Sequence, residues 1–464
     1  MATSRTGASG DPSSGSPWPA TGRPGRRPPR RARSRTAGLR AAGAAALAAV
    51  LLAGGCADGS ATREINLYIS PEEGLQEVVD RCNAEADGRY RIVYNQLPRD
   101  ADGQREQMVR RLAAEDTGLD VLGLDVTWIP EFAEAGWIEE WTGEHREEAV
   151  RDVLSGPLET AVWNDRVYGA PKNTNIQLLW YDNRITPEPP RTWDEMIRTA
   201  QRLRRDGRPY QVLFTGAQYE GLVVFFNSLV ASAGGTLLSD DGTEAVVDEG
   251  VVEALRLLKR LTTSGVTSPS LTNQREDEVR LAFQQGRGAF EFNWPYVYAS
   301  YRQEKPDDLR YFRWARYPVF EEGDVSRATA GGYNLAVSSY SRNKPAAFEA
   351  ALCLRSAESQ KFQALRSGLP PSIETVYDDD TPLDPDRPAD PETNPTMATE
   401  YPPKETIRAA LEEAAVRPLT PVYQNLSTVT AKILSPPSAI DPERTAERLR
   451  EELDAALKSQ GVLP

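Results

Sequence analysis

Two residues in this sequence combine useful chemistry with a place where a ligand could reach them. Asp125 ends the apolar run 121–124, which is typical of a buried strand, and its carboxylate can accept hydrogen bonds. Trp294 follows another apolar run, 288–292, and precedes Pro295, so its ring can form a rigid platform. The alternatives are that Asp125 caps the next helix and that Trp294 packs in the core. A carboxylate together with an aromatic ring suits a ligand with hydroxyls on weakly apolar rings.

Metal chemistry and nucleophilic catalysis have little support in the sequence. The chain has a single histidine, His145, and no zinc-like spacing of cysteines or histidines. Neither a metal enzyme nor a triad based on histidine is therefore expected, and we expect no cofactor.

An alternation of strands and helices positions these residues. Strands are predicted at 65–69, 90–94 and 121–124, and helices follow them, the first opened by Ser70, Pro71 and Glu73 as a capping box. This order predicts a mostly parallel, doubly wound α/β sheet, in which ligands bind beyond the carboxyl ends of the strands. Further helices are predicted at 193–203 after Thr192 as cap, 220–232, 251–262, 276–285, 345–354, 424–434 and 442–458, further strands at 178–181, 288–292 and 335–338, and a surface excursion at 377–404.

The first 55 residues have the pattern of a secretory signal. A leader with nine Arg and one Asp precedes an apolar run, 41–52, which is shorter than a bilayer span. Small residues then lead to Cys56, as in the lipobox of bacterial lipoproteins. We expect lipidation of Cys56, and the alternative is an ordinary cleaved signal with an incidental cysteine.

The composition and length of the chain indicate an acidic protein with two domains. Without the leader the formal charge falls from -14 to -22, because nine positive charges and one negative charge are removed. Nucleic acid and anionic lipid surfaces are not expected as partners of such a chain, because both bind basic surfaces. About 400 mature residues exceed one hydrophobic core and suggest two domains.

The cysteine count predicts a disulfide. The chain has three cysteines, and if Cys56 carries lipid, Cys82 and Cys353 remain in an oxidising compartment. We predict that these two form a bridge. Two separate buried thiols are the alternative.

A series of short motifs resembles the extracellular solute-binding proteins of carbohydrate ABC transporters, the maltose-binding-like family. Each motif is weak alone, but their order and spacing are specific and extend over residues 61–464. Within the family the resemblance is strongest to the trehalose-binding lipoproteins of mycobacteria. The motifs are Leu-Asp-Val-Thr-Trp at 124–128, Phe-Ala-Glu-Ala-Gly-Trp at 132–137, Tyr-Gly-Ala-Pro at 168–171, Leu-Trp-Tyr at 179–181, Phe-Gln-Gln-Gly at 283–286, Asn-Trp-Pro at 293–295 and Gly-Gly-Tyr-Asn-Leu at 331–335.

The resemblance implies a periplasmic-binding-protein-like α/β fold with two lobes joined by a hinge and a sugar site in the cleft. Each lobe is then assembled from discontinuous segments. The expected division is a signal peptide at 1–55, a tether at 56–62, a first lobe at 63–172 with about 333–376, and a second lobe at about 173–332 with about 377–464.

The resemblance also implies which residues touch the ligand. Asn175 stands where some relatives have Asp, which keeps hydrogen bonding but leaves the affinity open. Arg417 could otherwise form a surface ion pair, Glu276 could be favourable charge in the first turn of a helix, and a capping box would explain Glu73. The expected ligand contacts are Asp125, Asn175, Glu276, Trp294, Arg417, Gly332, Tyr333, Glu73 and Glu72, with Trp128 as either a structural or a ligand-facing residue.

The function implied by this resemblance is capture of a disaccharide, with trehalose expected, and its delivery to the permease of an ABC importer. We expect a monomer, anchored by lipid to the outer face of the cell membrane, that is not an enzyme. The alternatives are a maltodextrin, another glycan or a glycerophosphodiester on the same scaffold, and a secreted glycoside hydrolase that uses Asp125 and Glu276.

Overall fold

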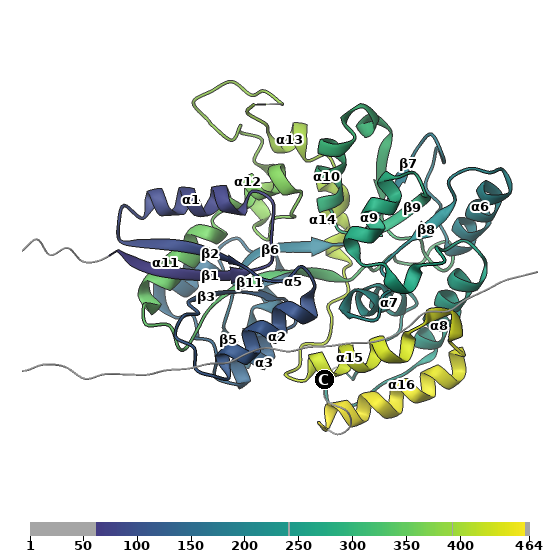
Figure 1. Cartoon of the computed structure of the whole chain (residues 1–464), viewed down its shortest axis with the longest axis horizontal. Coiled ribbons are helices and arrows are strands. Elements are labelled where there is room, and N and C mark those ends of the chain that lie inside the picture. Colours follow the sequence, from purple (N-terminus) through teal and green to yellow (C-terminus); the bar gives the residue numbers. More distant parts are fainter. Residues whose placement is uncertain (1–61, 240–241, 392, 460–464) are drawn as a thin grey trace, which may run out of the picture. The chain divides into compact units, whose positions relative to one another are not determined.

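The computed structural model describes residues 62–239, 242–391 and 393–459. The predicted signal peptide, the lipidation site Cys56 and the tether up to residue 61 lie outside the described residues. Two main β-sheets organise the described chain, one with five strands and one with four, and Figure 1 shows both with their covering helices. In the described chain no helix has both the length and the apolar character needed to cross a membrane.

The five-stranded sheet joins the beginning of the described chain to a much later strand. Strands β1, β2 and β3 pair in parallel, as predicted, whereas β11 pairs antiparallel with both β3 and β6. The sheet is therefore mixed rather than mostly parallel. Its order is β2 (Tyr90–Gln96), β1 (Arg63–Ile69), β3 (Val121–Asp125), β11 (Ala330–Val337) and β6 (Ala170–Ile176).

Both faces of this sheet are covered, because successive side chains of a strand point to opposite sides. Val121 packs in the cluster that includes side chains from α1 (Leu75–Glu85) and α11 (Lys344–Arg355). Its neighbour Leu122 packs in the other cluster, against α2 (Ala101–Leu112) and α3 (Ile129–Glu134). The sheet is thus doubly wound.

The four-stranded sheet is also mixed. Strand β7 (Leu178–Asp182) runs antiparallel to both β10 (Phe312–Ala315) and β9 (Gly288–Asn293), while β8 (Gln211–Leu213) pairs in parallel with β9. Thr192 accepts a hydrogen bond from Glu195 N at 3.2 Å and caps α6, as predicted. The helices packed in this core are α6 (Trp193–Arg205), α7 (Glu220–Ser232), α8 (Glu249–Thr263), α9 (Glu276–Gln284) and α10 (Tyr296–Glu304).

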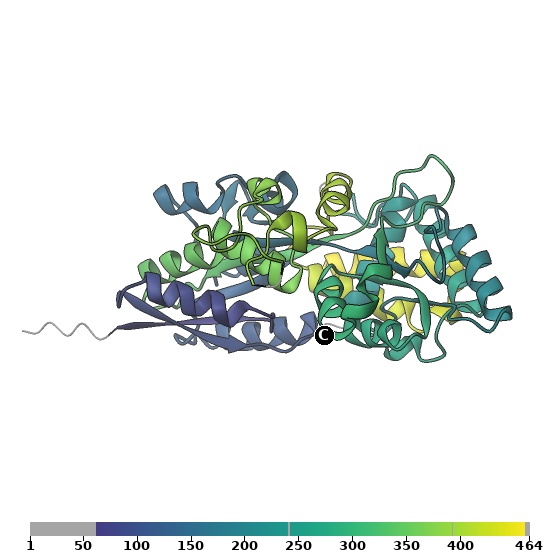
Figure 2. The ribbon, with the colours of Figure 1, turned by 90° about the horizontal axis from the view of Figure 1, so that it is seen from above.

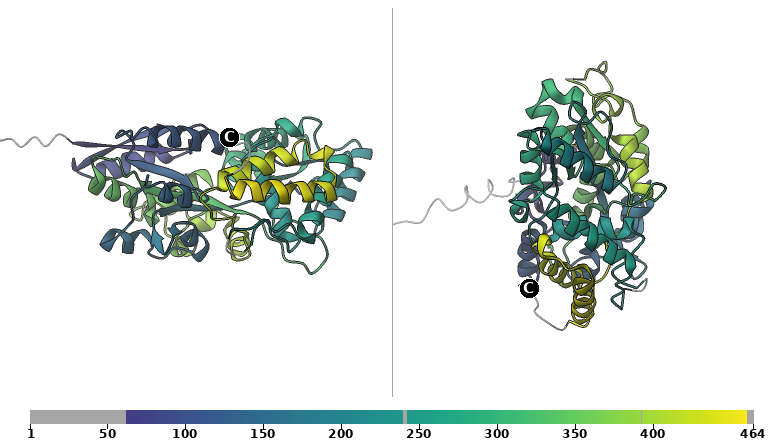
Figure 3. Two further views of the ribbon diagram at one scale, coloured as in Figure 1. Left: turned by 90° about the horizontal axis from the view of Figure 1, so that it is seen from below. Right: turned by 90° about the vertical axis from the view of Figure 1, so that its right-hand side faces the viewer.

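The last two helices complete this second core. Helix α15 (Tyr423–Leu434) packs on α7, α16 (Pro442–Leu457) packs on α8, and the two lie side by side, as Figure 3 shows in yellow. The remaining short elements are α4 (Gly143–Ala149), α5 (Ser155–Thr160), β4 (Val162–Trp163), β5 (Arg166–Val167), η1 (Leu271–Asn273), η2 (Pro306–Tyr311), α12 (Ala357–Ser367), η3 (Glu374–Asp378), α13 (Met397–Glu400), α14 (Lys404–Glu412) and η4 (Pro437–Ala439).

The chain passes from one sheet to the other over a very short distance in sequence. Strand β6 belongs to the five-stranded sheet and β7 to the four-stranded sheet, and only Gln177 separates them. Gln177 is buried, and its side-chain oxygen accepts a hydrogen bond from Tyr317 at 2.6 Å. The crossing is therefore held by packing rather than by a long linker.

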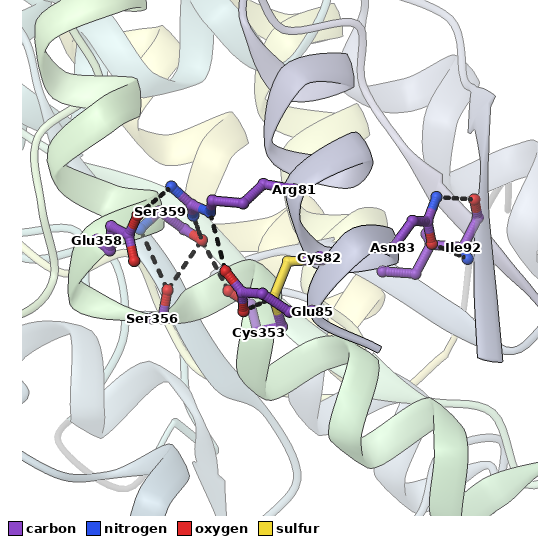
Figure 4. Close-up of a disulfide and its surroundings, with 9 residues drawn as sticks. All are labelled: Arg81, Cys82, Asn83, Glu85, Ile92, Cys353, Ser356, Glu358 and Ser359. Atoms are coloured by element: carbon purple, nitrogen blue, oxygen red, sulfur yellow. Dashed lines mark hydrogen bonds and ion pairs between the residues drawn. A yellow bond between two sulfur atoms is a disulfide. The ribbon is translucent and has the colours of Figure 1, made fainter. Parts of the chain in front are cut away.

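The predicted disulfide is present. Cys82 on α1 and Cys353 on α11 are 271 residues apart in sequence, and their Cα atoms are 5.9 Å apart. Figure 2 shows the green α11 region beside the purple N-terminal elements, and Figure 4 shows the bridge with Arg81 reaching Ser359 next to it. The bridge joins the two helices that cover one face of the five-stranded sheet.

Two local predictions are wrong. The first helix does not begin with a capping box: α1 begins at Leu75, and Gly74, with φ of 76°, precedes it, so residues 70–73 form a loop. The stretch 377–404 is not purely a surface excursion, because Met397 and Tyr401 are buried in the core of the four-stranded sheet. The high Asp and Pro content of the stretch predicted a surface segment, although it contains two residues that pack in the core.

Candidate functional site

A cavity of about 730 Å³ is lined by strands of the five-stranded sheet and by helices α7, α9 and α10, which pack in the core of the four-stranded sheet. All nine residues that the sequence predicts as ligand contacts line it, whereas Trp128 is 3% exposed and does not. This volume lies within the range of roughly 300–1,000 Å³ that small-molecule sites occupy. The nine are Glu72, Glu73, Asp125, Asn175, Glu276, Trp294, Gly332, Tyr333 and Arg417.

A buried guanidinium holds two carboxylates at one wall of the cavity. Arg417 is 3% exposed, and its Nη1 donates to Glu220 Oε1 at 2.7 Å while its Nη2 lies 3.0 Å from Asp125 Oδ1. The predicted alternative of a surface ion pair is therefore wrong. Asp125 also accepts hydrogen bonds from Thr127 N and Oγ1 and so shapes the turn before α3. It is both a turn residue and a cavity residue.

Burial and nearby charges shift the pKa values of these side chains in opposite directions. Burial raises the pKa of the Glu220 carboxyl, although Arg417 and the hydroxyls of Ser427 and Tyr423 oppose the rise. Burial alone would lower the pKa of the Arg417 guanidinium, but Asp125, Tyr423 and Glu220 raise it above its usual value. Arg417 Nε is buried and has no hydrogen-bond partner among the described residues.

Trp294 forms an aromatic wall. It follows β9 directly, its side chain is partly exposed, and its ring lies over Gly331 of β11. A Cβ at Gly331 would come within 3.0 Å of the Trp294 ring and within 3.4 Å of Asn175 Cβ. The absence of a side chain at this position therefore gives the ring its place, and Trp294 is not an ordinary core residue.

Glu276 is the first residue of α9 and faces a tyrosine rather than a cation. Tyr219 Oη donates to Glu276 Oε2 at 2.5 Å, and burial raises the pKa of the Glu276 carboxyl despite this bond. Arg275, the residue before it, lies over the Tyr219 ring at 4.7 Å. Glu276 is thus a built part of the cavity wall and more than favourable charge at a helix start.

The loop before α1 contributes an acid with one unused oxygen. Glu72 Oε2 accepts hydrogen bonds from Lys172 Nζ at 2.5 Å and from Gln363 Nε2 at 2.8 Å. Glu72 Oε1 is buried and has no partner in the part of the chain that the structure describes. Glu73 bonds with Gln303 of α10, so the loop also contacts an element of the other core.

Gly332 and Tyr333 enter the cavity from a bulge in β11. Gly332 has φ of 130°, and a Cβ there would meet Asn173 O at 2.4 Å, so only glycine fits. Tyr333 pairs with Asp125 across β11 and β3, and its hydroxyl donates to Gln104 at 3.1 Å. The register of β11 therefore places both residues beside Asp125.

Several lining residues were not predicted. Glu220 and Tyr219 lie at the start of α7, whose apolar composition predicts a buried helix and conceals the acid. An acid that opens an otherwise apolar helix was an available signal, but it also fits first-turn charge. The residues missed at the site include Ser70, Arg99, Gln104, Tyr219, Glu220, Arg275, Arg280 and Gln303.

The sequence matches the family profile described as "Bacterial extracellular solute-binding protein" over residues 68–361, which is more than half of its 464 residues. The chain belongs to this family. Membership makes it a binding protein rather than an enzyme, so the alternative of a glycoside hydrolase is set aside.

Comparisons with individual proteins agree with this family. A probable ABC transporter-binding protein of Deinococcus radiodurans is 29% identical to this solute-binding protein over 325 residues, which are 65% of this chain and 74% of the relative. A maltose-bound MalE3 structure of T. maritima superposes with a TM-score of 0.74 and 24% identity, covering 84% of this chain and 99% of that one. The GacH receptor of Streptomyces glaucescens gives a TM-score of 0.73 and 18% identity, covering 86% and 100%. The α/β periplasmic-binding-protein-like fold is confirmed.

Proposed function

We propose that this solute-binding protein captures a disaccharide, trehalose first among the candidates, and delivers it to the permease of an ABC importer. The supporting observation is that all nine residues expected from the sequence resemblance line one cavity. The resemblance to the mycobacterial trehalose-binding lipoprotein LpqY suggests the particular sugar. A maltodextrin or another glycan is the alternative ligand.

The chemistry of the cavity supports a hydroxyl-rich ligand. Carboxylates, an amide and a guanidinium line the same cavity as the partly exposed ring of Trp294. Glu72 Oε1 and Arg417 Nε are buried and have no partners among the residues that the structure describes, so a ligand that bonded with them would relieve their desolvation. A ligand without matching hydroxyls would leave such groups unpaired, which gives selectivity. The structural neighbours with bound maltose or acarbose support a carbohydrate over other solutes.

The proposed mechanism is closure of two lobes around a hinge. In the proposal one lobe comprises residues 63–172 with about 333–376 and the other about 173–332 with about 377–464, with the crossings shifted to Gln177 and Ala330 so that β6 and β11 stay whole in the five-stranded sheet. The contacts of Asp125 with Arg417 and of Glu73 with Gln303 join these segments across the cavity and suit a closed form. The closed form is the state that the permease would recognise.

The proposal also places the protein outside the cell membrane as a monomer. Lipidation of Cys56 would hold it at the outer face, near the permease. Mass spectrometry of the protein purified from the membrane fraction of its host tests the anchor: acyl chains on a mature chain that begins at Cys56 support it, and an unmodified Cys56 contradicts it.

Titration calorimetry of residues 57–464 tests the ligand. Trehalose is expected to bind with a one-to-one ratio, and Asp125→Ala is expected to weaken binding at least about tenfold, because it removes an acceptor and a partner of Arg417. Glu322→Ala, at an exposed residue outside the cavity, is the matched control. If maltose or another glycan binds and trehalose does not, that sugar replaces trehalose as the proposed ligand. If no carbohydrate binds, the proposed sugar site is contradicted.

A second prediction concerns the aromatic wall. Gly331→Ala is expected to weaken sugar binding about tenfold without loss of stability, because the new Cβ must displace the Trp294 ring. Gly156→Ala is the control, since a Cβ there meets nothing within 4 Å. Calorimetry and urea unfolding of both variants measure the two effects. Equal affinities in both variants would show that Trp294 does not contact the ligand.

A further inference from the structure

Asn293 does not line the cavity, but it links two parts of the cavity wall, Trp294 and the start of α9. It is completely buried at the end of β9, and its side-chain oxygen accepts a hydrogen bond from Trp294 N at 2.9 Å. Its Nδ2 donates to the main-chain oxygen of Glu276 at 3.0 Å and to Glu291 Oε1 at 2.8 Å. One amide therefore ties the aromatic wall to the start of α9, and each of its atoms fits its partners in only one orientation.

Glu291 is the anchor of this amide. It lies two residues earlier on β9, is 1% exposed, and faces Trp180 on β7 and Leu213 on β8 across the sheet. No cation lies within 4.0 Å of its carboxyl oxygens in the described chain. A carboxyl buried in this way is most stable when it is neutral, because an ion there would lack compensation.

Burial dominates the pKa shifts of Glu291 and of several groups on the helices packed against it. Burial raises the pKa of Glu291 to about 8, against weaker opposing effects of Asn293 and Arg280. Burial raises the pKa of Tyr301 on α10 to about 12, and it raises the pKa of Tyr296 well above its usual value. On α9, Arg280 has a raised pKa and pairs with Asp277 and Glu304, and Glu276 has a raised carboxyl pKa of its own.

We propose that Glu291 and Asn293 are positioning residues that set Trp294 and Glu276 for the ligand, and that ionisation of Glu291 disturbs this arrangement. An ionised Glu291 would draw water or the Arg280 guanidinium toward itself, and these donors would compete with the Asn293 amide for the Glu291 carboxylate. Neither residue lines the cavity, so both act through their neighbours. The inference rests on the proposed function as far as the ligand is concerned.

The pH dependence of sugar affinity tests this role. The sugar found by calorimetry is titrated at pH 7.0 and pH 9.5. Wild-type affinity is expected to fall about tenfold at the higher pH, as does that of Glu322→Gln, a distant exposed control. Glu291→Gln keeps a neutral acceptor for Asn293 and is expected to bind equally at both pH values. A flat wild-type profile, or the same fall in Glu291→Gln, would overturn the proposal.

Asn293→Asp tests the amide itself. The substitution keeps the shape but removes both donors, so binding at pH 7.0 is expected to weaken at least tenfold in a folded protein. Wild-type affinity in this variant would show that the amide only supports the fold. Circular dichroism establishes that the variant is folded, and Asn273→Asp, at an exposed residue outside the cavity, is its control.

Urea unfolding across pH 5 to 9 separates this inference from the choice of ligand. The pKa of Glu291 is raised from 4.5 to about 8, so the folded state retains a proton that the unfolded state releases. Wild-type stability is then lost relative to Glu291→Gln as pH rises through this interval, by roughly a thousandfold in the unfolding equilibrium. If no sugar binds but this difference appears, the proposed function fails while the buried neutral Glu291 stands. If the difference is absent, the positioning proposal fails even where sugar binds.

Discussion

Replacing Arg417 by methionine is expected to lower the free energy of unfolding by about 3–5 kcal/mol, because it removes one partner from a buried ionic group. Glu220 is 7% exposed, and of its partners in the described chain it would keep the hydroxyls of Tyr423 and Ser427. Methionine retains much of the side-chain volume, so a cavity contributes little to the loss. Sugar affinity is expected to fall as well, since Arg417 lines the cavity.

A double variant separates the charge from the shape. Glu220→Gln in the Arg417→Met background removes the uncompensated negative charge and leaves a side chain that can still bond with Tyr423 and Ser427. It is expected to recover most of the stability but not the sugar affinity. Urea unfolding measures the first quantity and calorimetry the second. If Arg417→Met is as stable as the wild type, the guanidinium contributes nothing to the fold, and its role is confined to the ligand.

Regular elements were predictable because their patterns are local. The run 121–124 and the alternation of Ile65, Leu67 and Ile69 predict strands, and Thr192 predicts the start of α6, all of which the structure contains. Strand direction was less predictable, because β11 reaches β3 from about 200 residues further along the chain and its orientation depends on tertiary packing. The loop at 70–74 was missed because Ser70, Pro71 and Glu73 match a capping box locally. In the structure, Lys172 and Gln363, which are distant in sequence, both donate hydrogen bonds to the neighbouring Glu72 and hold it in the loop.

The residues of the candidate site also divide into those that a local pattern predicts and those that depend on tertiary contacts. Asp125 and Trp294 could be found because Asp125 ends strand β3 and Trp294 directly follows strand β9. Arg417 and Glu276 needed the family resemblance, since nothing near them in sequence distinguishes them from surface charges. Glu220 was missed because its role depends on Arg417, which lies 197 residues further along the chain. Asn293 has its partners nearby in sequence, and it was missed because its motif does not show that the amide is buried and bonded to Glu291 and Glu276. The role of a buried ionic or amide group can be interpreted only when its hydrogen-bond partners are known.

Removing the disulfide is expected to destabilise the protein without changing its ligand affinity. In Cys82→Ala with Cys353→Ala, the free energy of unfolding is expected to fall by about 2–5 kcal/mol, because the bridge restricts an unfolded chain over a separation of 271 residues. Alanine adds no polar group at Cys82, which is fully buried. Neither cysteine lines the cavity, so sugar affinity is expected to stay within about twofold of the wild type.

Wild-type protein with its disulfide reduced is the matched control for this variant. It has no substitution, and its urea unfolding midpoint is expected to fall close to that of the double variant. Arg81, which bonds with Ser359 beside the bridge, still joins α1 to α12 in both samples, so the native contacts around the site of change are shared. If the double variant and the oxidised wild type unfold at the same urea concentration, chain restriction by the bridge does not contribute, and the packing of α1 on α11 holds this face of the sheet by itself.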